Sequence, residues 1–166
     1  MIELSTIRDI VAIASFIIAL SYYILNIQNQ RQTRQTQIFM NLYETYSSKE
    51  FRTNMTEIRS WEWETPDEFY EKYGERKYNP EAWNTFLTVA TFYNGLGVLL
   101  MKNLIIIDLV EELLSNAVFG AWSYMGEIVL DYRGRQPRHI ASRDIFHGFE
   151  YLYNELAKRG TVLNTN

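Results

Sequence analysis

Residues 10–46 read IVAIASFIIALSYYILNIQNQRQTRQTQIFMNLYETY, and this stretch decides how the chain is built. Its first sixteen residues carry no charge, and its middle is almost entirely Gln, Asn, Thr and Arg. No proline or glycine interrupts it; the next ones along the chain are Pro66 and Gly74. Gln and Arg favour the helix, and Asn and Thr are tolerated in it. The stretch therefore predicts one helix from about Arg8 to about Tyr46.

The apolar part of this helix has the composition of a membrane span. Residues 10–25 fall slightly short of the roughly 20 residues that cross a bilayer, and Leu4, Ile7 and Ile27 bring the run to length. Arg8 then lies near one end, where a long arginine stem can reach lipid headgroups. Tyr22 and Tyr23 lie near the other end, a depth that amphipathic rings favour. We therefore interpret residues 1–27 as a short tail and a transmembrane anchor.

The apolar run has two other possible interpretations. A cleaved signal peptide should begin with a basic segment and end at a small-residue cleavage site. Here Glu3 and Asp9 accompany Arg8, and Asn, Gln and Arg follow the run. A soluble helix that is apolar on every face needs protein on every face, which one small domain hardly supplies. Both alternatives fit the residues less well than a membrane anchor.

The polar part of the stretch predicts a stalk and an orientation. Arg31 and Arg34 follow the span, and no acidic residue appears until Glu44. An excess of Lys and Arg beside a span marks its cytoplasmic side, so we expect a cytoplasmic C-terminal domain at the cell membrane. We expect headgroup contacts from Arg8, Tyr22, Tyr23, Arg31 and Arg34. Ile38, Leu42 and Tyr46, spaced four apart, form an apolar stripe that should join the domain core.

Composition limits the remaining functions. The chain has 166 residues, of which 47% are hydrophobic and 15% aromatic, so a real core is expected. It has no cysteine, which excludes disulfides and thiolate chemistry. The first 34 residues hold two of the 20 acids and three of the 16 bases, which leaves 18 acids against 13 bases. A domain near −5 is repelled by phosphate backbones, so no nucleic-acid partner is expected.

The rest of the chain reads as helices with local start signals. Ser47 or Ser48 can cap a helix, with Glu50 completing a capping box from Ser47. Thr65 before Pro66 and Asn79 before Pro80 predict two further starts. Later boundaries are a core helix over 81–102 ended by Asn103, a helix capped by Asp108, and a last helix over 143–159 capped by Ser142 and stopped by Gly160. Gly95 and Gly97 predict close approach of a neighbouring helix.

These signals predict an all-α fold. One N-terminal transmembrane helix continues into a long helix that packs in a compact bundle of about five helices. We place a helical soluble domain over 28–160, with residues 28–46 as a stalk helix continuous with the anchor. Residues 161–166 are expected to form a frayed tail.

A resemblance adds to this interpretation. The single span, the segment RQTRQTQIFMNLYETYSSKEF, the segment FYNGLGVLLMKNLI, a Trp-bearing helix and a closing FEYL resemble a prokaryotic family of membrane-anchored helical proteins catalogued as a domain of unknown function. The resemblance covers most of the chain. It implies an anchor and a helical domain, and it implies no activity, cofactor or catalytic residue.

Residue pairs with possible chemistry have structural explanations. His147 and Glu150 share a helix face at the spacing of a metal pair, but a di-metal site needs a second such set and two more inward carboxylates. Glu111 and Glu112 suit the first turn of a helix through its dipole. Accordingly, we predict no catalytic residue, no metal and no cofactor.

Two groups are candidates for contact with a partner or an anion. Arg133, Arg135, Arg138 and Arg143 form a local basic excess expected in a loop, where they could meet headgroups, a phosphate or an acidic partner. Trp61 and Trp63 belong to an aromatic-rich segment that could form a peptide-binding surface. Solvated charges and core packing are the structural alternatives.

The function expected from these features is that of an accessory or scaffolding subunit. A membrane lipid surface and a larger membrane protein complex are the expected partners. A membrane-tethered ligand-sensing module, with the basic loop or a pocket beside Gly95 and Gly97, is the alternative. A small metal-dependent enzyme is a third and weaker hypothesis.

Overall fold

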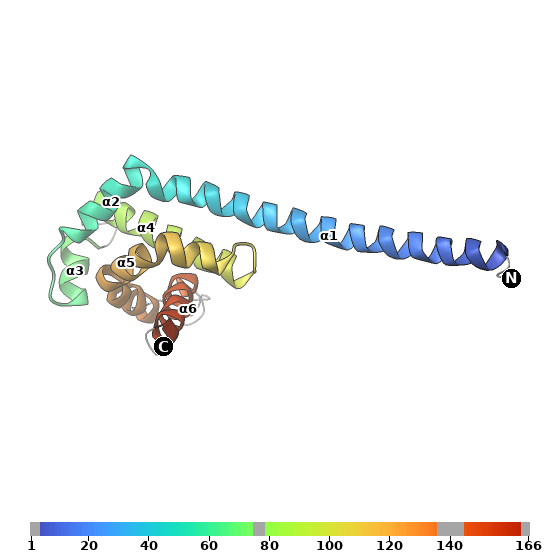
Figure 1. The fold of residues 1–166 in the computed structure, drawn as a ribbon. Helices are drawn as coiled ribbons and strands as arrows, with labels where there is room; N and C mark the ends of the chain where they lie inside the picture. The colour runs from blue at the N-terminus through green and yellow to red at the C-terminus, as the bar shows by residue number, and fades with distance from the viewer. Residues whose placement is uncertain (1–3, 75–78, 136–144, 164–166) are drawn as a thin grey trace. The chain divides into compact units, whose positions relative to one another are not determined.

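The computed structural model describes residues 4–74, 79–135 and 145–163, and every regular element in these ranges is an α-helix (Figure 1). In chain order the helices are α1 (Leu4–Ser47), α2 (Lys49–Arg59), α3 (Pro66–Lys72), α4 (Pro80–Met101), α5 (Ile107–Arg135) and α6 (His147–Leu163). The predicted all-α class, with a long N-terminal apolar helix and a compact helical bundle, is confirmed.

Contacts between residues divide the chain into two compact units, Met1–Gln37 and Ile38–Asn166. The described part of the first unit is helical throughout and belongs to α1. The predicted continuity is confirmed, because α1 runs without a break from the apolar run through the polar residues to Ser47. No residue in this range removes a backbone donor or breaks the helical hydrogen bonds.

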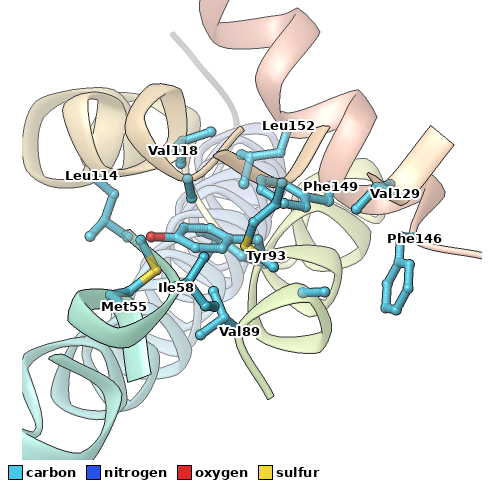
Figure 2. Packing of buried hydrophobic residues seen from close by; sticks show 14 of the residues in the cluster. Met55, Ile58, Val89, Tyr93, Leu114, Val118, Val129, Phe146, Phe149 and Leu152 are labelled. Atoms are coloured by element: carbon cyan, nitrogen blue, oxygen red, sulfur yellow. The ribbon is translucent and has the colours of Figure 1, made fainter. Parts of the chain in front are cut away.

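The second unit is built around α4. This helix packs most extensively against α6, and α2 and α5 also contact it. Tyr93 of α4 is fully buried, and its ring stacks on Phe149 of α6 with centroids 4.9 Å apart. Figure 2 shows the Tyr93 ring between Val118 and Ile58, which come from α5 and α2. The predicted stripe is also confirmed: Phe39 is buried, and Ile38, Leu42, Tyr43 and Tyr46 pack against the core.

Local cap signals predicted most helix starts. The hydroxyl of Thr65 accepts from the Glu68 amide at 3.3 Å, and the side chain of Asn79 accepts from the Ala82 amide at 3.1 Å. Ser48 caps α2 by accepting from the Phe51 amide. The predicted capping box is wrong, because Ser48 rather than Ser47 is the cap and Glu50 then lies one position too early.

Three boundaries differ from prediction. Helix α5 begins at Ile107, which places Asp108 inside the first turn rather than at the cap. Helix α6 begins at His147, not at Arg143, because the preceding turn includes Phe146 with a left-handed φ of 55°. Gly160 does not stop α6, which continues to Leu163. Ser142 itself lies outside the described residues.

The close helix approach predicted by glycines occurs at one of the two positions. A Cβ added to Gly97 would lie 1.8 Å from the carbonyl oxygen of Gly148 in α6. The Gly148 amide donates to the side-chain oxygen of Asn94 at 2.9 Å, which fixes the crossing. A Cβ on Gly95 would meet nothing within 4 Å, so the prediction for Gly95 is wrong. The expected pocket beside Gly97 is filled by the backbone of α6.

Candidate functional site

The first candidate is the apolar surface of α1. Every residue from Arg8 to Arg34 is exposed, including nearly all the large apolar side chains of the run. The most apolar window of this helix has a mean hydropathy of 2.2, and none of it is buried. Contiguous exposed apolar surface of this extent marks a membrane or protein interaction site. The side chains at its centre are Ile10, Val11, Ile13, Phe16, Ile17, Ile18, Leu20, Ile24, Leu25 and Ile27.

Two helices in the described chain are long and apolar enough to cross a membrane, α1 and α4. The α4 window has a lower mean hydropathy of 1.2, and 39% of it is buried. Its buried side chains form the centre of the second unit's core. The apolar run of α1 has no such protein covering, so α1 is the stronger candidate for a span.

The two serine hydroxyls within the apolar run are satisfied by the helix itself. The hydroxyls of Ser15 and Ser21 donate to the carbonyls of Val11 and Ile17, each at 2.8 Å. Hydroxyls that return to the preceding turn need no water, which suits a segment surrounded by hydrocarbon.

The residues predicted at the ends of the run lie on the surface of α1. Arg8 pairs with Asp9 at 3.1 Å, and both side chains are exposed. Tyr22 and Tyr23 are 71% and 62% exposed. Arg31 and Arg34 are also exposed, three residues apart on the polar part of the helix. Headgroup contact by these five side chains remains a prediction.

The predicted basic loop is partly helix. Arg133 and Arg135 belong to the last turn of α5, which corrects their assignment to a loop. Arg133 donates to the Ile145 carbonyl at 3.1 Å and pairs with Glu150 at 2.7 Å, so it ties α5 to α6. Arg138 and Arg143 lie outside the described residues.

Arg135 ties α5 to α3. It pairs with Asp131 and, at 2.6 Å, with Asp67, and its guanidinium lies over the Tyr70 ring at 4.6 Å. Hydrogen bonds to Asp131 and Asp67 raise the pKa of Arg135 further above its ordinary value. Both arginines are therefore engaged within the chain, which supports the structural alternative for them.

The two candidate tryptophans also pack internally. The Trp61 ring stacks on Tyr73 with centroids 4.7 Å apart, and Trp63 meets the edge of Phe69 at 5.7 Å. Both tryptophans are half-buried. Together these rings hold the short helix α3 on the bundle, and partner contact through their exposed edges remains a prediction.

Three carboxylates from the predicted helix starts and the His147 pair take part in ion pairs. Glu150 accepts from Arg133, whereas His147 is exposed. Glu111 and Asp108 both accept from Arg159 of α6, at 2.5 and 2.6 Å. Over residues 4–74, 79–135 and 145–163, no group of three or more potential ligands could hold a metal ion. The partner Arg159 was missed, because pairing across 48 residues leaves no local signal.

Sequence reasoning also missed a cleft in the second unit. It has a volume of about 290 Å³ and lies against α2, α4 and α5, with Tyr46 from the end of α1 also in its lining. Its lining residues are Tyr46, Phe51, Arg52, Met55, Thr56, Arg59, Tyr93 and Ala117. The helical spacing of 52, 55, 56 and 59 places these four on one face of α2, but the sequence does not reveal that the face borders a cleft.

These features define an all-α protein with an exposed apolar helix and a compact helical unit. The family model described as domain of unknown function, DUF4760, matches residues 9–156, and the chain belongs to this family. The match begins beside the apolar run and ends within α6. No match is found among curated proteins or among solved structures.

Proposed function

We propose that this protein is a single-span membrane protein whose helical domain serves as an accessory or scaffolding subunit of a larger membrane protein complex. The observation that carries the proposal is the uninterrupted exposed apolar surface of α1. Residues 8–27 of an α-helix extend about 30 Å, which matches the hydrocarbon thickness of a bilayer. Insertion would remove this surface from water and anchor the chain.

Charge supports the proposed orientation. Arg31 and Arg34 follow the span, and Arg8 on the other side is paired with Asp9. The cytoplasmic side of a span carries the excess of Lys and Arg, so the helical domain faces the cytoplasm in this proposal. Anionic lipids of that leaflet would attract both arginines.

The polar segment of α1 supports a docking role. Residues 28–37 are all polar and nearly all exposed, so this part of the helix has no apolar face of its own. A helix that is polar all round gains little from burial in its own chain. Amide side chains carry both donors and acceptors and can bridge to neighbouring helices at a membrane. We assign this segment as the contact with the partner complex.

Photo-crosslinking tests the docking role. A photoreactive residue replaces Thr36 in the polar segment or, as a matched control, the exposed Thr88 of α4. We expect Thr36 to give one discrete adduct with an integral membrane protein, and Thr88 to give none. Native mass measurement after gentle detergent extraction should show the same protein bound. A lone monomer with no adduct at Thr36 would contradict the proposed role.

A further inference from the structure

The cleft against α2, α4 and α5 has an apolar wall. Phe51 and Met55 of α2 keep only 3% and 7% of their surface exposed, and Tyr93 of α4 is fully buried, so the apolar side chains border the cleft through their edges. Phe51 and Tyr93 form an aromatic pair with centroids 6.0 Å apart. Such walls favour a compact apolar or aromatic group. A volume of about 290 Å³ limits the occupant to a small molecule or to one end of a larger one.

Two arginines border the same cleft. Arg52 and Arg59 are two helical turns apart, so both lie on the face of α2 that carries Met55. The Arg59 guanidinium reaches toward α5, because a Cβ added to Gly120 would lie 3.6 Å from its Nη2 atom. Both arginines belong to the cleft lining and are exposed to solvent. An occupant of the cleft would therefore meet guanidinium groups on one side and the edges of Phe51 and Met55 on the other.

These two arginines differ from those at the helix junctions. Arg133, Arg135 and Arg159 each pair with a carboxylate of another helix. Among the described residues, neither Arg52 nor Arg59 forms an ion pair with a carboxylate. Glu57, the nearest acid in sequence to Arg59, instead accepts from the Thr85 hydroxyl at 3.3 Å. The guanidinium groups at the cleft thus retain donors for an anion.

A second hollow on α2 gives weaker support for a ligand site. It is lined by Ser47, Lys49, Arg52, Thr53, Thr56, Glu57 and Ser60. The hydroxyls of Ser47, Thr53 and Ser60 all donate to backbone carbonyls of their own helices. These hydroxyl protons are therefore already used in hydrogen bonds within the chain. No aromatic residue is among the residues that line this hollow.

We propose that the cleft lined by Arg52, Arg59, Met55 and Tyr93 binds a small amphipathic anion. The guanidinium groups hold a phosphate or carboxylate, and a compact apolar group lies against the accessible edges of Phe51 and Met55. Arginine forms two parallel hydrogen bonds with such groups, which makes it more selective than a point charge. This ligand site does not depend on the proposed docking role, and it would make the domain a membrane-tethered binding module.

Methionine-methyl NMR of the full chain in neutral lipid nanodiscs tests the proposal. Phenyl phosphate is the probe, with benzyl alcohol and inorganic phosphate as its neutral and headgroup-only counterparts. Met55 reports on the cleft, and the fully buried Met125 reports on the fold. We expect phenyl phosphate to shift the Met55 methyl signal with a roughly millimolar Kd, as its size predicts. Benzyl alcohol and inorganic phosphate should bind at least about tenfold more weakly.

The arginines are tested in the same assay. Replacing both, Arg52→Ala with Arg59→Ala, should weaken binding by about tenfold to a hundredfold. Lys102→Ala removes an exposed cation from the end of α4 and should leave the Kd unchanged. The double variant Arg52→Lys with Arg59→Lys keeps the charge but loses the planar fork of the guanidinium. Its Kd should therefore lie between those of the wild-type chain and the double Arg→Ala variant. An unchanged Met125 signal verifies that each variant is folded.

The source of the anion is distinguished by a further sample. Nanodiscs that contain anionic phospholipid, without a soluble probe, should leave Met55 unshifted if the ligand comes from solution. A shift there that disappears in the double Arg→Ala variant would assign the same chemistry to a lipid headgroup. The proposal is overturned if neither phenyl phosphate nor anionic lipid shifts Met55, or if the shift persists in the folded double variant.

Discussion

At the scale of single residues, packing across α4 and α6 separates two glycines that look alike in sequence. Gly97 faces the Gly148 backbone, whereas Gly95 has open space around its missing Cβ. We expect Gly97→Ala to destabilise the fold by about 1–3 kcal/mol, because α6 must move to admit a methyl group. Gly95→Ala should stabilise it by up to about 1 kcal/mol through helix propensity. Chemical denaturation of the full chain measures both, and equal effects would refute the assigned crossing.

Glu68 makes a pH-dependent contribution to the fold. Its carboxylate accepts from Lys72 at 2.6 Å and from the Glu64 amide at 2.8 Å. The hydrogen bond from Lys72, followed by that from Glu64, lowers the pKa of Glu68 below its ordinary value of 4.5. The stability gained is therefore fully present above the unfolded pKa and is lost as pH falls through the lower folded pKa.

The variant Glu68→Gln tests this contribution. The wild-type chain should have the higher Tm at about pH 7, and the difference should shrink as the pH is lowered toward about 3. Thermal unfolding at a series of pH values measures it. A difference in Tm that stays constant across the series would show that the Glu68 charge does not act as described.

Residue-scale pairing was the least predictable part of the candidate sites. Arg133 and Arg135 stand in a basic stretch of sequence, yet Glu150 and Asp67, which pair with them, are distant along the chain. Likewise, Arg52 and Arg59 become candidate ligand contacts only because α4 and α5 complete a cleft beside α2. Such partners depend on tertiary packing, for which the local sequence carries no signal.

At the scale of elements, boundaries governed by local chemistry were predicted and the others were not. Thr65–Pro66 and Asn79–Pro80 start helices because the cap and the fixed proline φ act within one turn. The end of α4 at Met101 is equally local, because Asn103, two residues further on, has a left-handed φ of 53°. The start of α6 instead follows Phe146, an unusual left-handed residue whose ring is buried in the core. Tertiary packing there overrides local preference.

The predicted membrane orientation depends on two arginines in the polar segment of α1. Replacing Arg31 and Arg34 by Glu should lower the fraction of molecules with a cytoplasmic domain, because the positive charges beside the span are removed. The control Thr33→Glu with Gln37→Glu adds two acids to the same segment and retains both arginines. Acidic residues weigh little in this rule, so the control should keep the wild-type orientation. Protease protection measures the orientation. Unchanged protection in the arginine variant would show that these residues do not set it.

At the scale of the whole molecule, the fold class followed from hydrophobic patterning and punctuation. The continuity of α1 was predictable because no residue between Leu25 and Ser47 breaks a helix. The all-α bundle was predictable because each apolar stripe has helical spacing. The cleft was not, since it arises where α2, α4 and α5 meet the end of α1.

The central claim is that residues 10–27 of α1 lie in lipid, and a depth measurement tests it most directly. Because the chain has no cysteine, single cysteines at Ile18 and Thr33 can each carry a nitroxide label in the liposome-reconstituted protein. Electron paramagnetic resonance then compares collisions with apolar oxygen and with a water-soluble relaxing agent. The account predicts high oxygen access and little contact with the aqueous agent at position 18, and the reverse at position 33. Equal access of the aqueous agent at both positions would contradict it.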